Sequence, residues 1–401
     1  MERGAPPQRL SGGVRLALAF GALVCAGLSA GSAADRLSAG DPALAARVPT
    51  LFASEALRTL GAQALADGKA VDAAGIGTRA IRNAPTDPQS TALFGAGKLA
   101  IGNRVLADRA FRIAGELGWR VPITQGYWMG QALSEGKYDV AALRLDALLR
   151  QQPALLRQRQ LTDPMERNPA GQAAMVARMR FNPVWLAYYA GDVESMPADV
   201  GLQRAAVLDL AGQRGLILGC KRIAPIASRL ATVNQAAAGV ALWKQHCPAA
   251  GQGLVSDGQL TTLDIAAKPT VFSWELIGNS ELALSILPDG NGTGKRLLID
   301  GEADVPRSIL AQHFVASPGQ YLLTWRTGNP QEQASDRILA AVTCPGGIPD
   351  WASATLNHAT GLWQAPITIG AQCPLHRLVF AAASHSGQVW LEQVALNPAP
   401  H

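Results

Sequence analysis

One group of oxygen-bearing side chains has a spacing that suits metal chemistry. Asp289, Asn291, Thr293 and Asp300 reproduce the oxygen spacing of a calcium-binding loop. However, the group lies between predicted strands rather than helices, and its last residue is Asp where such loops end in Glu. A hairpin turn with solvated acids accounts for the same residues. The sequence therefore leaves a structural calcium ion and a plain turn as alternatives, and it indicates no other cofactor.

Tryptophans in the C-terminal third could bind carbohydrate, because pyranose rings stack on exposed aromatic faces. The candidates are Trp274, Trp325, Trp351 and Trp363. Trp351 follows a turn-forming Pro-Asp pair and is the best candidate for an exposed platform. Trp325 shares a strand face with Tyr321 and could equally be a core residue, since tryptophan is usually largely buried.

A second aromatic group lies near the middle of the chain. Phe181, Trp185, Tyr188 and Tyr189 fall on one predicted helix, between Gly171 and Gly191. These side chains could line a concave groove that binds a protein. Alternatively, they are the packing of a capping helix.

Motifs that would identify an enzyme are scarce. The sequence contains no His-Glu-x-x-His pair and no Gly-x-x-x-x-Gly-Lys-Ser/Thr phosphate loop. Paired carboxylates for glycoside cleavage cannot be recognised from sequence, because their separation is spatial. A net charge of +5 without a block of Lys or Arg indicates no nucleic-acid partner. We therefore predict a non-enzymatic protein, with a glycan-modifying enzyme as the alternative.

The N-terminal region has the pattern of a targeting segment. Three arginines precede a run of 19 residues without charge, from Leu16 to Ala34. Small residues at Ser32 and Ala34, before Asp35, suit a signal peptidase, so a cut after Ala34 is expected. The alternative is retention of residues 16–34 as an inner-membrane anchor, for which the length is borderline.

Cysteine usage agrees with export. Apart from Cys25 in the apolar run, the chain has Cys220, Cys247, Cys344 and Cys373. Sequence neighbours would form the disulfides Cys220–Cys247 and Cys344–Cys373, and each would stabilise the fold by about 3 to 4 kcal/mol. The alternative is four buried free thiols.

A repeat of 34 residues organises the N-terminal third. Glycines recur at this spacing at Gly68, Gly102 and Gly136, and alanines follow each by five residues at Ala73, Ala107 and Ala141. Glycine suits a helix C-terminus that needs a left-handed backbone, and a small residue suits a close crossing of two helices. A fixed period in this range predicts stacked helix pairs.

This pattern resembles the tetratricopeptide repeat, over units 54–87, 88–121 and 122–155. The spacing is kept, but Ala64 stands where the family usually has Tyr, and Met129 replaces a small residue. The resemblance implies a solenoid whose concave surface binds a protein partner.

The remaining chain is predicted to change from helix to sheet. We expect a signal peptide at 1–34, helical repeats at 35–155, a degenerate helical cap at 156–250, a linker at 251–259 and an antiparallel β-sandwich at 260–399. The nine predicted strands are 270–276, 282–287, 295–300, 308–314, 321–326, 337–344, 362–369, 376–382 and 389–396.

The sandwich region resembles the jelly-roll carbohydrate-binding modules of exported bacterial proteins. The resemblance depends on Phe272-x-Trp274, on a central hairpin from Pro318 to Trp325, and on Trp363-x-x-Pro366. With tetratricopeptide units in front, the chain is similar to Gram-negative envelope proteins that accompany polysaccharide synthesis and export. These resemblances imply a periplasmic adaptor that binds an envelope protein and polysaccharide; a pure protein scaffold is the other alternative.

Overall fold

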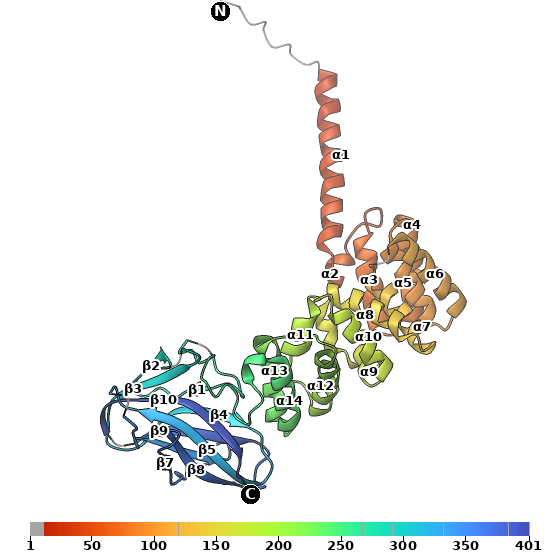
Figure 1. The fold of residues 1–401 in the computed structure, drawn as a ribbon. Coiled ribbons are helices and arrows are strands. Elements are labelled where there is room, and N and C mark those ends of the chain that lie inside the picture. The colour runs from red at the N-terminus through yellow and green to blue at the C-terminus, as the bar shows by residue number, and fades with distance from the viewer. Residues whose placement is uncertain are drawn as a thin grey trace, which may run out of the picture. The chain divides into compact units, whose positions relative to one another are not determined.

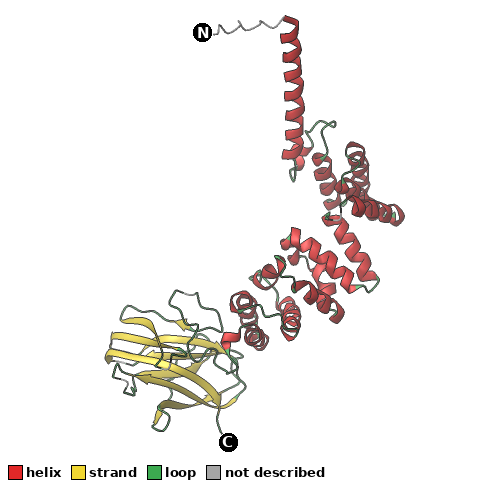
Figure 2. Ribbon diagram, turned by 45° about the horizontal axis from the view of Figure 1, so that its top comes forward, coloured by secondary structure: helices red, strands yellow, loops and turns green. Residues whose placement is uncertain are grey.

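A computed structural model describes residues 12–118, 120–266, 268–290, 292–331, 333–383 and 385–400. The chain divides into two compact units, Met1–Gln152 and Pro153–His401. The described part of the first unit is built of helices, whereas the second has helices followed by two β-sheets (Figure 1 and Figure 2). The predicted fold class, helical repeats followed by a β-sandwich, is confirmed.

The first unit consists of a long N-terminal helix and three helical hairpins. The long helix, α1, is apolar and long enough to cross a membrane over Leu16–Leu37. The bounds are α1 Gly12–Leu37, α2 Pro42–Ala45, α3 Glu55–Ala66, α4 Ala70–Asn83, α5 Pro88–Ala100, α6 Arg104–Leu117, α7 Pro122–Ser134 and α8 Tyr138–Gln151.

The repeating glycines end the first helix of each hairpin. Gly68, Gly102 and Gly136 have φ angles of 73°, 81° and 69°, the left-handed conformation predicted from their spacing. The three alanines that follow them, Ala73, Ala107 and Ala141, are completely buried. Small side chains therefore let the helices of a hairpin approach closely.

An aspartate that caps α5 also contacts α3 and so connects the first two hairpins. The Asp87 carboxylate accepts hydrogen bonds from the backbone N–H groups of Gln89 and Ser90, at 3.3 and 3.0 Å, and so caps α5. The same carboxylate accepts a hydrogen bond of 2.9 Å from Arg58 of α3. Arg58 also pairs with Glu55. This contact fixes the entry to the second hairpin against the first.

The second unit begins with six α-helices and two 3-10 turns. A buried ion pair lies among these helices, with Arg204 Nε 3.7 Å from Glu166 Oε1. Burial raises the pKa of Glu166, and Arg204 opposes this shift. The bounds are η1 Pro153–Arg157, α9 Arg159–Glu166, α10 Pro169–Met179, α11 Trp185–Gly191, α12 Ala198–Gln213, α13 Cys220–Thr232, α14 Ala236–His246 and η2 Pro248–Ala250.

Two antiparallel sheets follow, in the orders β1-β4-β9-β6 and β2-β3-β10-β5-β8-β7. Apolar side chains from both sheets form one core between them. The strands are β1 Glu275–Leu276, β2 Leu282–Pro288, β3 Lys295–Ala303, β4 Arg307–Phe314, β5 Gly319–Gly328, β6 Ile338–Thr343, β7 Thr355–Asn357, β8 Leu362–Ile369, β9 His376–Ala382 and β10 His385–Pro398.

Several predicted strands differ from the structure at their ends; β10, for example, begins at His385 rather than at Val389. The three-residue strand β7 was not predicted, and the first strand begins at Glu275 rather than Thr270. Thr270 and Ser273 explain the later start: the Thr270 N–H donates to Ser273 Oγ at 2.7 Å, and the Ser273 N–H donates to the Thr270 carbonyl at 3.1 Å. This turn replaces the extended backbone that the sequence pattern suggested.

The segment predicted as a linker is fixed against the sandwich. Ser256 is buried, and its N–H and carbonyl both bond to the side chain of Gln312 in β4, at 2.7 and 2.9 Å. Val394 of β10 donates its N–H to the Gly258 carbonyl at 2.8 Å. Residues 251–259 are therefore a structured connection.

Both predicted disulfides are present, Cys220–Cys247 and Cys344–Cys373. They close loops of similar size within the second unit, with sequence separations of 27 and 29. Cys25, on α1, is free and exposed.

The left-handed glycines give a direct test of the repeat geometry. We expect Gly102→Ala to lower the free energy of unfolding of the helical unit by about 1 kcal/mol, because alanine is strained in the left-handed backbone conformation. A Cβ at this position would meet no atom within 4 Å, so the effect reports the backbone strain alone. Gly130→Ala is the matched control: this helical glycine also has open space, so we expect a gain of up to about 1 kcal/mol. Urea unfolding followed by circular dichroism measures both, and equal effects would contradict the assignment.

Candidate functional site

The second unit contains a cavity of about 590 Å³ between its last two helices and the segment that leads into the sandwich. This volume lies in the range usual for small-ligand sites. Three stretches form its walls: the start of α13, the end of α14 with the turn after it, and residues 256–274.

A disulfide and a histidine hold the helical wall. Cys220, the first residue of α13, is bonded to Cys247, which follows the last residue of α14. The buried ring of His246 contacts the Leu208 carbonyl through Nε2 at 2.9 Å, and its Nδ1 accepts the Leu218 N–H at 3.3 Å. This arrangement requires the neutral ring with its proton on Nε2.

Hydrogen bonds to Asp257 fix the conformation of the segment that forms the opposite wall of the cavity. The two carboxylate oxygens of Asp257 accept from the backbone N–H and hydroxyl groups of Thr261 and Thr262, at 2.6 to 2.8 Å. The Asp257 carbonyl accepts from Trp274 Nε1 at 2.9 Å. Because the indole N–H is satisfied there, Trp274 is held with 6% of its surface exposed and lines the cavity.

The lining combines aromatic rings with charged groups. Trp274 and Trp243 contribute apolar surface, and Trp243 is 5% exposed. Lys221 and Lys268 are exposed, and neither forms an ion pair with a described residue. Asp264 is an exposed acid on the same lining. Such a cavity can bind a polar molecule that also has an apolar face.

The start of α13 adds a further positive feature to this wall. Its N-cap is Gly219, at φ 84°, which provides no side-chain cap, and the first turn contains no acidic residue. The backbone N–H groups of a helix start carry partial positive charge and favour an acceptor or an anion. Lys221 and Ala224, in the first turns of this helix, line the cavity.

The structure separates the four tryptophans predicted to bind carbohydrate. Trp325 is completely buried and packs edge-on against Phe380, at 5.8 Å between ring centroids, so it has no exposed face on which a sugar ring could stack. Alternation along β5 places it in the core, as the competing interpretation held. Trp274 lies at the cavity, whereas Trp351 and Trp363 are partly exposed and lie outside it.

The predicted aromatic groove is also divided, because the one helix predicted between Gly171 and Gly191 is two helices, α10 and α11, with Phe181 between them. Trp185 and Tyr189 are 2% and 0% exposed, so they cannot line an open groove. Tyr189 lies beneath the guanidinium of Arg204, 4.9 Å from the ring centroid, and so covers the buried ion pair. Phe181 and Tyr188 are exposed, by 67% and 48%. Trp185 and Tyr189 therefore pack α11 against its neighbours, as the alternative interpretation stated, whereas Phe181 and Tyr188 remain on the surface.

Asp289 and Asp300, the first and last residues of the predicted calcium loop, do not lie together. Asp300 of β3 pairs with Ala283 of β2, and Asp289 follows the end of β2, six residues after Ala283, a distance of roughly 20 Å at the rise of a strand. The Asp289 carboxylate instead accepts from the N–H and hydroxyl of Thr293, at 2.9 and 3.3 Å. Asn291 lies outside the described residues. Among the described residues, no group of three His, Cys, Asp or Glu side chains is arranged to hold a metal ion.

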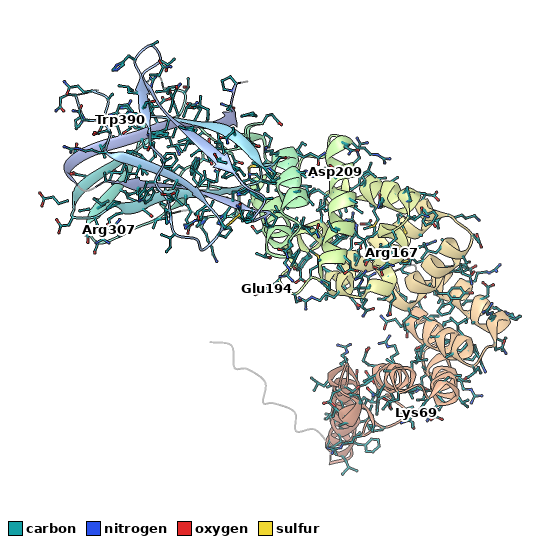
Figure 3. All side chains as sticks on the ribbon, turned by 90° about the horizontal axis from the view of Figure 1, so that it is seen from below. Lys69, Arg167, Glu194, Asp209, Arg307 and Trp390 are labelled. Carbon is teal, nitrogen blue, oxygen red and sulfur yellow. A yellow bond between two sulfur atoms is a disulfide. The ribbon has the colours of Figure 1, made fainter. Side chains whose placement is uncertain are left out.

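A buried charged cluster on the six-stranded sheet was not predicted. Arg296 of β3 donates to Glu392 of β10 at 3.0 Å and stacks on the ring of Trp390, which Figure 3 labels on the sandwich, at 4.3 Å. Burial raises the pKa of Glu392, and Arg296 partly opposes this. All three residues are buried, so the cluster stabilises the sheet rather than offering a surface.

The first unit has an open groove of about 630 Å³ across the first helices of its hairpins. Glu55, Arg58 and Thr59 of α3 line one part, and Leu93 of α5 and Ile123 of α7 line another. Ile123 is 40% exposed, so the groove offers apolar as well as charged groups. A groove of this kind suits an extended or helical peptide segment.

The cavity residues Lys221, Lys268, Trp243 and Asp264 were missed by the sequence interpretation. They come from segments that had been assigned to different domains, namely the helical cap and the sandwich. The paired cysteines were the only signal in the sequence that placed the start of α13 beside the end of α14. No pattern indicated that residues 256–274 would fold back onto them.

No family model matches this sequence, and no curated protein matches it significantly. Solved structures are similar to the C-terminal β-sandwich. One is TmCBM61 in complex with β-1,4-galactotriose, with 12% identity and a TM-score of 0.27, covering 37% of this chain and 100% of that chain. Another is the enzymatically active domain of tailspike protein 4 of bacteriophage CBA120, with 14% identity and a TM-score of 0.26, covering 36% of this chain and 21% of that chain.

The buried histidines predict how stability depends on pH. Burial lowers the pKa values of His246, His313 and His376, whereas the unfolded chain binds protons near pH 6.5. The unfolded state therefore gains protons first as the pH falls, so the free energy of unfolding should be highest above pH 6.5 and decrease below it. Denaturant titrations between pH 5 and 8 measure this dependence.

A variant isolates the contribution of the cavity wall. His246→Gln should flatten part of the pH dependence, because glutamine does not titrate. His358→Gln, which makes the same substitution at an exposed histidine outside the cavity lining, is the control. A stability that rises as the pH falls from 7 to 5 would contradict the buried neutral state.

Proposed function

We propose that this chain is a non-enzymatic binding protein of the bacterial cell envelope. Its second unit would bind carbohydrate in the cavity beside α13, and its first unit would hold a segment of a protein partner in the groove across α3, α5 and α7. The observation that carries the proposal is the cavity, in which aromatic, cationic and acidic side chains meet in a volume of about 590 Å³.

Carbohydrate suits the cavity because a sugar ring has both an apolar face and a rim of hydroxyl groups. Trp274 and Trp243 supply rigid apolar surface for the ring face. Lys221 and Lys268 can donate hydrogen bonds, and Asp264 can accept them. The ammonium groups of Lys221 and Lys268, which pair with no acid among the described residues, and the start of α13, which has no side-chain cap, also favour a saccharide that carries a carboxylate.

The hydrogen bonding of the two acidic residues on the cavity lining, Asp257 and Asp264, favours binding over catalysis. Asp257 has its carboxylate oxygens occupied by Thr261 and Thr262, whereas Asp264, whose Oδ1 accepts the Ala266 N–H at 2.9 Å, is the exposed acid on the lining. Hydrolysis of a glycosidic bond by the usual mechanism requires two carboxyl groups on opposite sides of that bond. We accordingly propose a binding role.

A protein partner is proposed for the helical hairpins because of their resemblance to tetratricopeptide repeats. The 34-residue spacing and its left-handed glycines are the features that support the resemblance. Together with the apolar α1 helix and two disulfides, they support an envelope adaptor in a Gram-negative bacterium, with exopolysaccharide synthesis or export as the proposed setting.

Affinity electrophoresis of the full chain in gels containing galactan or alginate tests the carbohydrate proposal. We expect Lys221→Ala and Lys268→Ala each to raise the Kd by about tenfold, the effect of losing one charged hydrogen bond. Both side chains are exposed, so the fold should survive. Arg222→Ala is the matched control: it removes the same charge from the next position of α13, outside the cavity lining.

The alternatives give different results in the same experiment. If retention is lost on Trp351→Ala but not on Lys221→Ala, the carbohydrate site is at the edge of the sandwich. If neither polymer retards the native chain, the sandwich is a protein scaffold without sugar binding. A shortening of the polymer after incubation would identify a glycan-cleaving enzyme and refute the binding role.

A further inference from the structure

The N-terminal helix α1 exposes its apolar side chains along most of its length. Leu16, Phe20 and Leu23 are 76%, 69% and 72% exposed. The uncharged stretch 16–34 is about 28 Å long as a helix, close to the roughly 30 Å thickness of a bilayer core. A cleaved signal sequence and a retained anchor share these properties, so the distinction must come from how the helix ends.

The end of α1 is packed into the first hairpin unit. A Cβ built on Gly31 would lie 2.5 Å from the ring of Phe52, so the ring lies directly on the helix backbone. Ser38, just beyond the helix, is completely buried and donates its N–H to the Ala34 carbonyl at 3.1 Å. The last turns of α1 therefore form part of the fold.

Asp35 supplies the cap of the first repeat helix. Its buried carboxylate accepts the N–H groups of Glu55 and Ala56, at 3.0 and 2.9 Å. Ser54, the residue in the N-cap position of α3, makes no side-chain cap bond of its own. A carboxylate from α1 thus satisfies the start of α3, where negative charge is favourable.

Cleavage after Ala34 would disturb each of these contacts. It would remove the backbone that covers Phe52 and the Ala34 carbonyl, one of the two carbonyls that accept from the Ser38 N–H. It would also create an α-ammonium on Asp35, beside the positive start of α3. Removal of α1 would therefore lower the stability of the first unit.

We propose that α1 is retained and anchors the protein in a lipid bilayer. Arg3, Arg9 and Arg15 precede the apolar run and favour a cytoplasmic N-terminus, which places the hairpins outside the cytoplasm. Leu51, beside Phe52, is 81% exposed. Because Phe52 contacts α1 at Gly31, within the apolar stretch, this turn lies at the membrane interface and no spacer separates the first hairpin from the bilayer.

Expression of the full chain in a Gram-negative host, followed by carbonate extraction and intact-mass measurement, tests the proposal. We expect the wild-type chain to keep all residues and to remain with the membrane pellet. Ser32→Leu changes an exposed residue that a signal peptidase would need to be small, so we expect it to leave mass and location unchanged. A soluble wild-type chain that starts at Asp35, with Ser32→Leu kept at full length, would overturn the proposal.

Replacement of residues 1–34 by a cleavable signal from another exported protein tests the structural part. We expect a chain released from the membrane and a lower melting temperature for the helical unit, because Asp35 would then carry an α-ammonium and Phe52 would be uncovered. An unchanged melting temperature would show that α1 is not part of the fold and would overturn the proposal. Neither outcome depends on carbohydrate binding.

Discussion

The disulfide between Cys220 and Cys247 is the constraint on which the cavity of the second unit depends. It fixes the start of α13 to the end of α14 and closes a loop that is worth roughly 3 to 4 kcal/mol in the loop-entropy account. Gly239 of α14 lies so near α13 that a Cβ would be 2.6 Å from the Ala227 carbonyl and 3.3 Å from the Phe272 ring. Residues 256–274 therefore dock on a rigid helical pair, and the cavity forms between them.

Local patterns in the sequence predicted most of the fold. The phase of Gly68, Gly102 and Gly136 indicated three hairpins because a left-handed helix end is a short-range requirement that glycine alone meets easily. Alternation and turn residues located most strands, and the cysteine spacing predicted both disulfides. The turn at Thr270 was mistaken for a strand because its side-chain hydrogen bonds compete with the extended backbone.

The candidate site was less accessible from the sequence, because it depends on which segments meet in space. Trp274 was among the predicted ligand residues and lines the cavity. Trp325 was predicted on the same grounds, but it lies on the face of β5 that points into the core. The spacing of Asp289 and Asp300 suggested one site, but the strand register places Asp300 beside the start of β2, whereas Asp289 follows its end. Lys221 and Lys268 are ordinary surface lysines in sequence, and only their shared cavity gives them a role.

A structure of the full chain with a bound acidic oligosaccharide is the most direct test of the central claim, which is that the cavity binds carbohydrate. The account predicts a sugar ring against Trp274, with its polar groups within hydrogen-bond distance of Lys221 or Lys268. A sugar seated on the outer face of the six-stranded sheet or at Trp351, with the cavity empty, would contradict it.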